Sequence, residues 1–214
     1  MSLALRKLYG ALVCLMQRDW KRLVAYSSIS HLGFCTLGIF ALNLNGLTGS
    51  VVQQINHGIS TGLLFLLVGF IYERRHTREI GDFGGIAQIM PAFATAFAIT
   101  VFSSAGLPLL NGFIGEFTII SGAFAANRIW AVIAVAGIVF SAAYLLWLYQ
   151  RTMMGPVKYE VNRRLPDLTL RERVIVAPLL VLVFAIGIYP APLFTALRPA
   201  VNALLQQLQQ GSAQ

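Results

Sequence analysis

Three ionisable side chains stand inside long apolar runs of this sequence: His31 in SSISHLGF, His57 in QINHGIS and Glu116 in NGFIGEF. An acid at the centre of a bilayer costs about 2.5 to 3.5 kcal/mol even on a lenient insertion scale, so acids kept there tend to be functional. An imidazole accepts a proton on one ring nitrogen and donates one from the other. If the apolar runs cross a membrane, these residue types are suited to passing protons.

The composition indicates a membrane protein. Of the 214 residues 57% are hydrophobic and 11% charged, with a mean hydropathy of +0.72, whereas about 25% of residues are charged in soluble proteins. The net charge of +8 comes from short basic clusters between apolar runs, which favours membrane orientation over nucleic-acid binding. Cys14 and Cys35 lie in apolar stretches without the spacing of a disulfide or metal pair, so we expect no metal site.

A membrane-spanning helix needs about 20 apolar residues. By that measure the sequence contains four uninterrupted spans, the last of them short and preceded by a Thr169–Glu172 capping box. A kink is expected at Pro178 in the last span. The four spans are Leu23–Leu44, Val51–Tyr72, Ile129–Tyr149 and Val174–Tyr189.

The segment Ile86–Ala126 is too long for one straight helix. Gly106, Pro108, Asn111 and Gly112 interrupt it, so it is predicted to be one broken span made of two half-helices. A second break is expected where His57-Gly58 is followed by Ser60-Thr61-Gly62. Broken backbone at membrane depth is tolerated where it is buried in protein or lines a water-filled cavity.

The basic residues support a single crossing of the broken segment. With that topology, twelve of the sixteen Lys and Arg residues fall on one side of the membrane, in loops 17–22, 73–79 and 151–173. Cytoplasmic loops are enriched in such residues, so this side is predicted to be cytoplasmic. The other side receives Arg6, Lys7, Arg128 and Arg198.

Both ends of the chain depart from the spanning pattern. Leu8–Met16 is too short to cross and has the character of the end of a span. Residues 191–214 place leucines at helical spacing beside Gln and Asn, which is typical of an amphipathic interfacial helix. We expect an all-α polytopic bundle with about five full spans and a partial N-terminal helix, divided into residues 1–190 and 191–214.

The three ionisable side chains are predicted to share one depth. His31 is ten residues past Lys21, His57 eleven past Gly46 and Glu116 ten before Ala126, so each lies about 15 Å from a membrane face. This clustering favours a proton relay over the alternatives of a structural ion pair or a helix–helix hydrogen bond. Lys21, Ser60, Gly106, Pro108 and Asn111 are supporting candidates near the relay or the break.

Three stretches resemble the antiporter-like M subunits of proton-translocating NADH:quinone oxidoreductase, respiratory complex I. They are DWKRLVAYSSISHLGF, QQINHGISTGLLFLLVGFIYERRHTREIGDFGG and GLPLLNGFIGEF. The resemblance implies a fold of two inverted five-helix repeats, each with a broken helix, of which this chain matches the C-terminal portion. The family's first-half glutamate and its lysines have no counterpart here, and Leu109 stands where glycine is usual. The N-terminal MSLALRK is unlike the helix expected there, so we expect a truncated product, an internal start or a designed fragment.

The resemblance also implies roles and partners. Glu116 matches the family's glutamate on the broken helix of the second half, and His31 and His57 match its two histidines of the central hydrophilic axis. The function implied is proton translocation within the assembled membrane arm of the complex. The implied location is a bacterial inner membrane, beside other membrane-arm subunits. No cofactor is expected in this chain, since NADH, flavin, iron–sulfur clusters and quinone belong to other subunits.

Two other functions stay open at this point. One is a subunit of an Mrp-type Na⁺/H⁺ antiporter or of a membrane-bound hydrogenase, in which the same relay would serve. The other is a non-transporting truncated fragment, which the missing first half favours.

Overall fold

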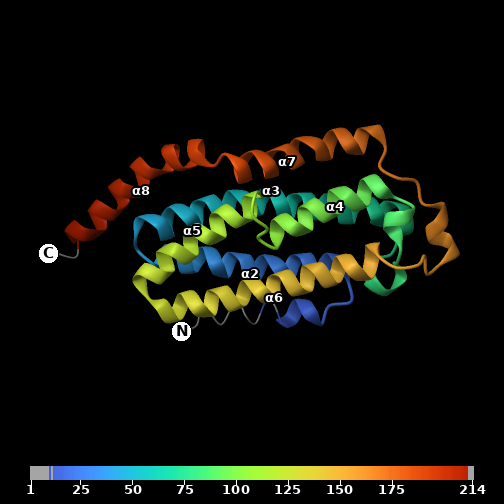
Figure 1. Ribbon diagram of the computed structural model, residues 1–214, viewed down its shortest axis with the longest axis horizontal. Coiled ribbons are helices and arrows are strands. Elements are labelled where there is room, and N and C mark those ends of the chain that lie inside the picture. Colours follow the sequence, from blue (N-terminus) through green and yellow to red (C-terminus); the bar gives the residue numbers. More distant parts are fainter. Residues whose placement is uncertain (1–9, 11, 212–214) are drawn as a thin grey trace.

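The computed structural model describes residues 10 and 12–211 as a bundle of long helices lying side by side (Figure 1). Within those residues every regular element is a helix, apart from an isolated β-bridge between Asp19 and Glu79. The expected all-α class is confirmed. The α-helices are α2 (Trp20–Phe40), α3 (Leu44–Arg75), α4 (Pro91–Ser104), α5 (Asn111–Ala126), α6 (Arg128–Met153), α7 (Leu170–Ile188) and α8 (Ala191–Gly211). Short 3₁₀ helices lie in the loops at Ile80–Asp82, Ile86–Gln88 and Glu160–Arg164.

Side-chain caps set the ends of α2 and α3, which differ from the predicted spans. The Asp19 carboxylate accepts a hydrogen bond from the Arg22 backbone N–H at 2.8 Å and starts α2 before the apolar run. The Asn43 side chain caps α3 in the same way, accepting from the Gly46 N–H at 2.8 Å. As a result α3 has 32 residues and begins well before the predicted Val51.

The predicted broken span is present, and it is the crossing formed by α4 and α5. These helices have 14 and 16 residues, so neither alone matches the thickness of the hydrocarbon layer. Figure 1 shows them end to end along the bundle, with the break at residues 105–110 between them. Gly106 (φ +80°) and Leu109 (φ +74°) take left-handed backbone conformations in that break.

The second predicted break is wrong, because α3 runs without interruption through Gly58 and Gly62. A Cβ added at either glycine would meet no other atom within 4 Å. Each glycine lowers helix propensity by only about 1 kcal/mol relative to alanine. Within a long apolar helix this cost is too small to stop the hydrogen-bond ladder.

Length and apolarity qualify three helices of the described chain as single crossings, namely α2, α3 and α6. Helices α7 and α8 pass the same test only as a pair, with a bend of 71° between them. The capping box predicted at the start of α7 is confirmed, since Thr169 and Glu172 exchange both of its hydrogen bonds. Pro178 lies inside α7, which is assigned as one helix on both sides of it.

Part of the predicted N-terminal end is also helical, at residues 10 and 12–15. The other positions of Leu8–Met16 before Leu12, together with Arg6 and Lys7, lie outside the described residues. So do residues 212–214 of the predicted tail. The division of the chain at residues 190 and 191 stays a prediction.

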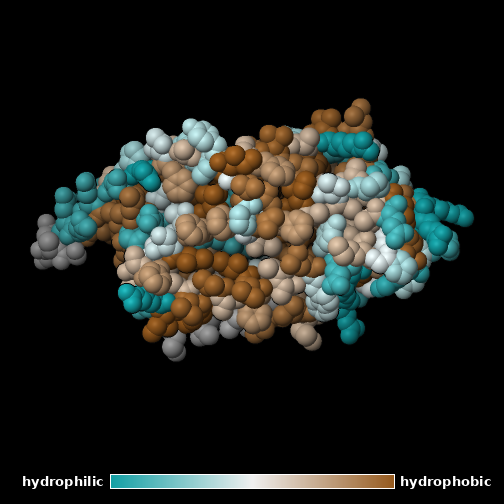
Figure 2. Space-filling view, viewed as in Figure 1, coloured by the Kyte–Doolittle hydropathy of each residue, from teal (hydrophilic) through white to brown (hydrophobic). Residues whose placement is uncertain are grey.

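The charged loops gather at one end of the bundle, as the charge count predicts. The Trp20 N–H donates to the Arg78 carbonyl at 2.8 Å, and the Ile80 N–H donates to the Arg18 carbonyl at 2.7 Å, which joins the first two basic loops. Arg75 Nε donates to Asn162 Oδ1 at 2.7 Å and joins the second to the third. Figure 2 shows hydrophilic side chains at the two ends of the molecule and an apolar band between them.

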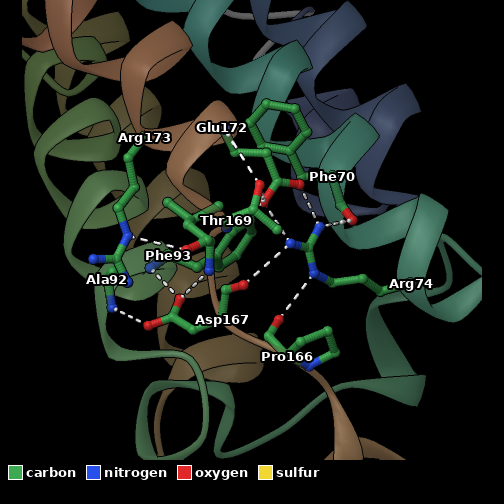
Figure 3. Close-up of polar contacts among 10 residues, drawn as sticks. Phe70, Arg74, Ala92, Phe93, Pro166, Asp167, Thr169, Glu172 and Arg173 are labelled. Carbon is green, nitrogen blue, oxygen red and sulfur yellow. Dashed lines mark hydrogen bonds and ion pairs between the residues drawn. The ribbon is translucent and has the colours of Figure 1, made fainter.

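A buried ion pair fastens this charged end (Figure 3). Arg74 holds Glu172 with two hydrogen bonds of 2.7 and 2.6 Å and also donates to the carbonyls of Pro166 and Asp167. The Asp167 carboxylate accepts from the Ala92 and Phe93 backbone N–H groups at 2.9 and 3.0 Å. One loop therefore joins the end of α3 to the beginnings of both α4 and α7.

Two apolar clusters occupy the core, one toward each end of the bundle. The larger cluster lies toward the charged loops and includes Trp20, whose ring meets those of Phe83 and Phe97 edge-on at 5.2 Å each. The smaller cluster includes Phe34 on α2 and Ile119 on α5. On α2, the buried polar residues Ser27, Ser30 and His31 lie between Val24 of the larger cluster and Phe34 of the smaller one. The buried polar groups of α3, α4 and α5 that adjoin His31 complete this polar layer.

Candidate functional site

His31 and Glu116 meet in the polar layer between the two apolar clusters. His31 Nδ1 lies 3.4 Å from Glu116 Oε1, and each residue is 3% exposed. His31 comes from α2 and Glu116 from α5, the second half of the broken crossing. The structure thus brings an imidazole into ion-pair distance of the acid, as their predicted common depth suggested.

His57 is the second neighbour of His31. The two imidazole rings lie 5.3 Å apart between centroids, with their planes tilted by 37°. His57 is partly buried on α3, and its Nδ1 is 3.0 Å from the Thr61 hydroxyl one turn later. The order in space is His57, His31 and Glu116, so His31 is the central member.

The ring nitrogens of His31 are held loosely. Both are buried, and within the described part of the chain neither makes a hydrogen bond of good geometry, although Nδ1 lies within ion-pair distance of Glu116. A buried polar group left in this state calls for an explanation. An imidazole that exchanges protons with two neighbours has to be free to change which nitrogen carries the proton.

The break between α4 and α5 makes room for the Glu116 carboxylate. Gly106 has a φ of +80°, and a Cβ added there would lie 2.6 Å from Glu116 Oε2. The positive φ favours glycine at this position, and a side chain there would also displace the Glu116 carboxylate. Pro108 and Leu109, on the outer side of the break, are exposed.

A hydrogen-bonded cluster ties the break to α3. Asn111 Oδ1 accepts from the Ser103 and Ser60 hydroxyls at 2.5 and 3.2 Å, and these hydroxyls are 2.9 Å apart. Asn56 Nδ2 donates to the Asn111 carbonyl at 2.6 Å. Asn111 begins α5 through these contacts with α3 and α4, whereas the residue at the N-cap position is Leu110.

A small polar cavity lies among these groups. Its lining combines His31 and His57 with the residues of the cluster, and its volume for a water-sized sphere, about 10 Å³, is at the lower limit for one water. The cavity joins the imidazole pair to the broken backbone. The lining residues are His31, Gln53, Asn56, His57, Ser60, Ser103, Ser104 and Gly112.

The supporting candidates divide into two groups. Ser60, Gly106 and Asn111 lie at the site, whereas Lys21 is exposed in the first turn of α2, ten residues before His31. Sequence reasoning missed Ser103, Asn56 and Gln53, which are polar residues in apolar helices. The signal available in the sequence was their position as polar residues inside apolar segments, because polar side chains in a membrane segment tend to face protein.

The chain is similar to known proteins along most of its length. The family model described as NADH:quinone oxidoreductase/Mrp antiporter, TM, matches residues 2–141. This chain belongs to that family. One relative is NADH-quinone oxidoreductase subunit M of Rhodobacter capsulatus, which is 43% identical over 198 residues, covering 92% of this chain and 39% of the relative.

Solved structures show the same fold. A chain of respiratory complex I from Thermus thermophilus with bound NADH superposes with a TM-score of 0.88 at 36% identity, covering 95% of this chain and 43% of that one. A chain of the Mrp complex from Dietzia sp. DQ12-45-1b superposes with a TM-score of 0.85 at 22% identity, a likeness of fold. The chain spans about two fifths of the length of the family members it matches. It is an integral membrane protein by family and by its apolar helices.

Proposed function

We propose that this chain carries protons within the membrane arm of an NADH:quinone oxidoreductase, in the manner of an M-type subunit. The observation that carries the proposal is the position of His31, in contact range of both His57 and Glu116 in a polar layer between two apolar clusters. In the relay a proton passes between His57 and Glu116 through His31. The break between α4 and α5 places the acid against Gly106, and its partner His31 lines the polar cavity.

The partners follow from the same proposal. The family members it resembles are named as subunits of larger complexes, so we infer that neighbouring membrane-arm subunits supply the rest of the path. Redox cofactors would be held by other subunits, and electron transfer there would drive the protons here. The membrane would be a bacterial inner membrane, with the charged loops on its cytoplasmic side.

Replacing Glu116 with Gln in the assembled complex tests the relay, because the amide keeps the shape of the side chain and cannot take up a proton. We expect the rate of proton pumping to fall at least about tenfold relative to a matched control. A tenfold decrease corresponds to an activation barrier that is about 1.4 kcal/mol higher. The measurement is the pH change across vesicles energised with NADH, scaled to the amount of assembled complex. Glu160→Gln is the control, because it makes the same change on an exposed loop. Unchanged pumping in Glu116→Gln would reject the relay and leave a structural role.

The dependence of transport on sodium distinguishes the proposed function from that of an Mrp-type antiporter subunit. The family description covers both kinds of complex, and the 43% identity to an M subunit favours the oxidoreductase. Transport by an antiporter subunit would depend on the sodium gradient, whereas pumping in the proposed complex should continue when potassium replaces sodium. For the 214-residue chain alone, a flux assay in proteoliposomes shows whether this half of the relay conducts; no flux would agree with a non-transporting fragment.

A further inference from the structure

An apolar groove of about 430 Å³ lies between α4 and α7, on the outer surface of the bundle away from the histidine pair. Ala92 and Ala96 of α4 and Ala177 of α7 are small, so the two helices leave space between them. Ile99 and Leu180 line the groove farther along the same helices. Both helices begin at the charged end of the molecule, so the groove runs from the charged loops into the apolar band.

Arg173 stands at the mouth of this groove, near the start of α7 (Figure 3). Its Nε donates to the Leu168 carbonyl at 3.0 Å, which anchors the side chain. Among the described residues no hydrogen bond or ion pair engages its two terminal nitrogens, and the residue is exposed. A fixed guanidinium with free donors thus faces the entrance.

The carboxylates near Arg173 are already engaged. Asp167 accepts hydrogen bonds from the backbone N–H groups at the start of α4 and from the Leu168 N–H at 2.7 Å. Glu172 is paired with Arg74. Arg173 makes no ion pair with a described carboxylate, so its two terminal nitrogens are available to an anionic group from outside the chain.

We propose that this groove binds an anionic phospholipid, with one acyl chain between α4 and α7 and the phosphate at Arg173. The groove is apolar along its length and cationic at the end that meets the membrane face. That sequence of surfaces matches a lipid from tail to headgroup, and basic sites at the cytoplasmic ends of membrane helices bind anionic headgroups. A zwitterionic lipid should bind less well, because its amine offsets the attraction of the phosphate for Arg173.

Native mass spectrometry of the purified 214-residue chain tests this, with phosphatidylglycerol and phosphatidylcholine of the same acyl chains added in turn. The wild-type chain should retain phosphatidylglycerol in preference. Arg173→Gln should lower its affinity about fivefold, the ratio that corresponds to about 1 kcal/mol for one basic side chain at a membrane surface. Ala177→Leu should fill the groove and reduce binding of both lipids.

Two matched variants control for charge and folding. Arg171→Gln removes a charge from the same helix at an exposed position outside the groove lining and should bind as wild type. Arg173→Lys keeps the charge and should keep the preference for phosphatidylglycerol, which excludes misfolding as the cause of the loss in Arg173→Gln. Equal retention of the two lipids by wild type, or an equal loss in Arg171→Gln and Arg173→Gln, would overturn the proposal.

The assembled complex decides between a lipid and another subunit in the groove. A photoreactive amino acid at position 95, an exposed part of the groove lining on α4, should cross-link to phospholipid there. A cross-link to a protein chain would show that a helix, and not a lipid, covers this face.

Discussion

The two buried carboxylates of this chain have partners of different kinds, and the difference indicates which one can carry a proton. Glu172 is held by the Arg74 guanidinium and by the Thr169 N–H and hydroxyl, and these hydrogen bonds lower its pKa from 4.5 to about 2. Because arginine keeps its charge at all ordinary pH values, this pair stays ionised. Glu116 faces His31 at 3.4 Å and has no arginine or lysine partner among the described residues, which supports the proposed exchange of a proton between the two.

The lowered pKa of Glu172 makes its stabilising effect depend on pH. A group with a folded-state pKa of about 2 and an ordinary value of 4.5 stabilises the fold fully above the ordinary value, and the effect disappears as pH falls toward 2. Glu172→Gln should therefore cost about 3 kcal/mol at pH 7, and the variant should approach wild type as the pH is lowered from 5 to 2. Thermal unfolding in detergent micelles over that range measures it.

The exposed pair of Glu160 and Arg163 provides the control for this experiment. Their side chains are 84% and 62% exposed, so Glu160→Gln should leave the unfolding temperature unchanged at every pH. If Glu172→Gln shows the same small difference from wild type at pH 7 and at pH 3, the ion pair does not stabilise the charged end as described.

At the scale of elements, the break between α4 and α5 is the feature on which the site depends. It brings the Gly106 backbone against the Glu116 carboxylate and places Ser103 and Asn111 within reach of α3. Leu109 holds a left-handed conformation that costs a leucine about 1 to 2 kcal/mol, so strain is present in the same segment.

Two glycine-to-alanine variants compare the effect of a substitution in the break with the effect of the same substitution inside a continuous helix. Gly106→Ala adds a Cβ to a residue with positive φ and directs it at the carboxylate, so it should destabilise the chain by about 1 to 2 kcal/mol and reduce proton flux. Gly58→Ala lies in the continuous part of α3 with open space around it and should be neutral or stabilising by up to about 1 kcal/mol. Equal unfolding temperatures for the two variants would contradict this view of the break.

The sequence was sufficient to predict the helices and the break at Gly106 and Pro108. It also predicted the shared depth of His31, His57 and Glu116, because the length of an apolar run and the helical rise determine depth. The false break at Gly58 and Gly62 shows a limit of the same reasoning, since a glycine weakens a helix without saying whether packing keeps it intact. The hydroxyl pair Ser60 and Ser103 was not predictable as a contact. It depends on how α3 packs against α4, which is a property of the tertiary structure.

At the scale of the whole molecule, the charge asymmetry predicts an orientation in the membrane. The basic loops meet at one end, and the connection between α5 and α6 lies at the other (Figure 1). Since basic residues are retained on the cytoplasmic side, the end carrying Arg74 and Arg163 should face the cytoplasm. The phospholipid groove opens at that same end, which places its cationic mouth in the leaflet that carries anionic lipid.

Single cysteines test this orientation in intact cells. Arg163 and Ala126 are exposed at opposite ends, whereas Cys14 and Cys35 are buried and should give little background. A membrane-impermeant maleimide should label Ala126→Cys from outside once the outer layers of the cell are opened, and it should label Arg163→Cys only after the inner membrane is permeabilised. The wild-type chain should stay unlabelled in both cases. Labelling of Arg163→Cys before permeabilisation would reverse the orientation, and with it the direction in which the relay has to deliver protons.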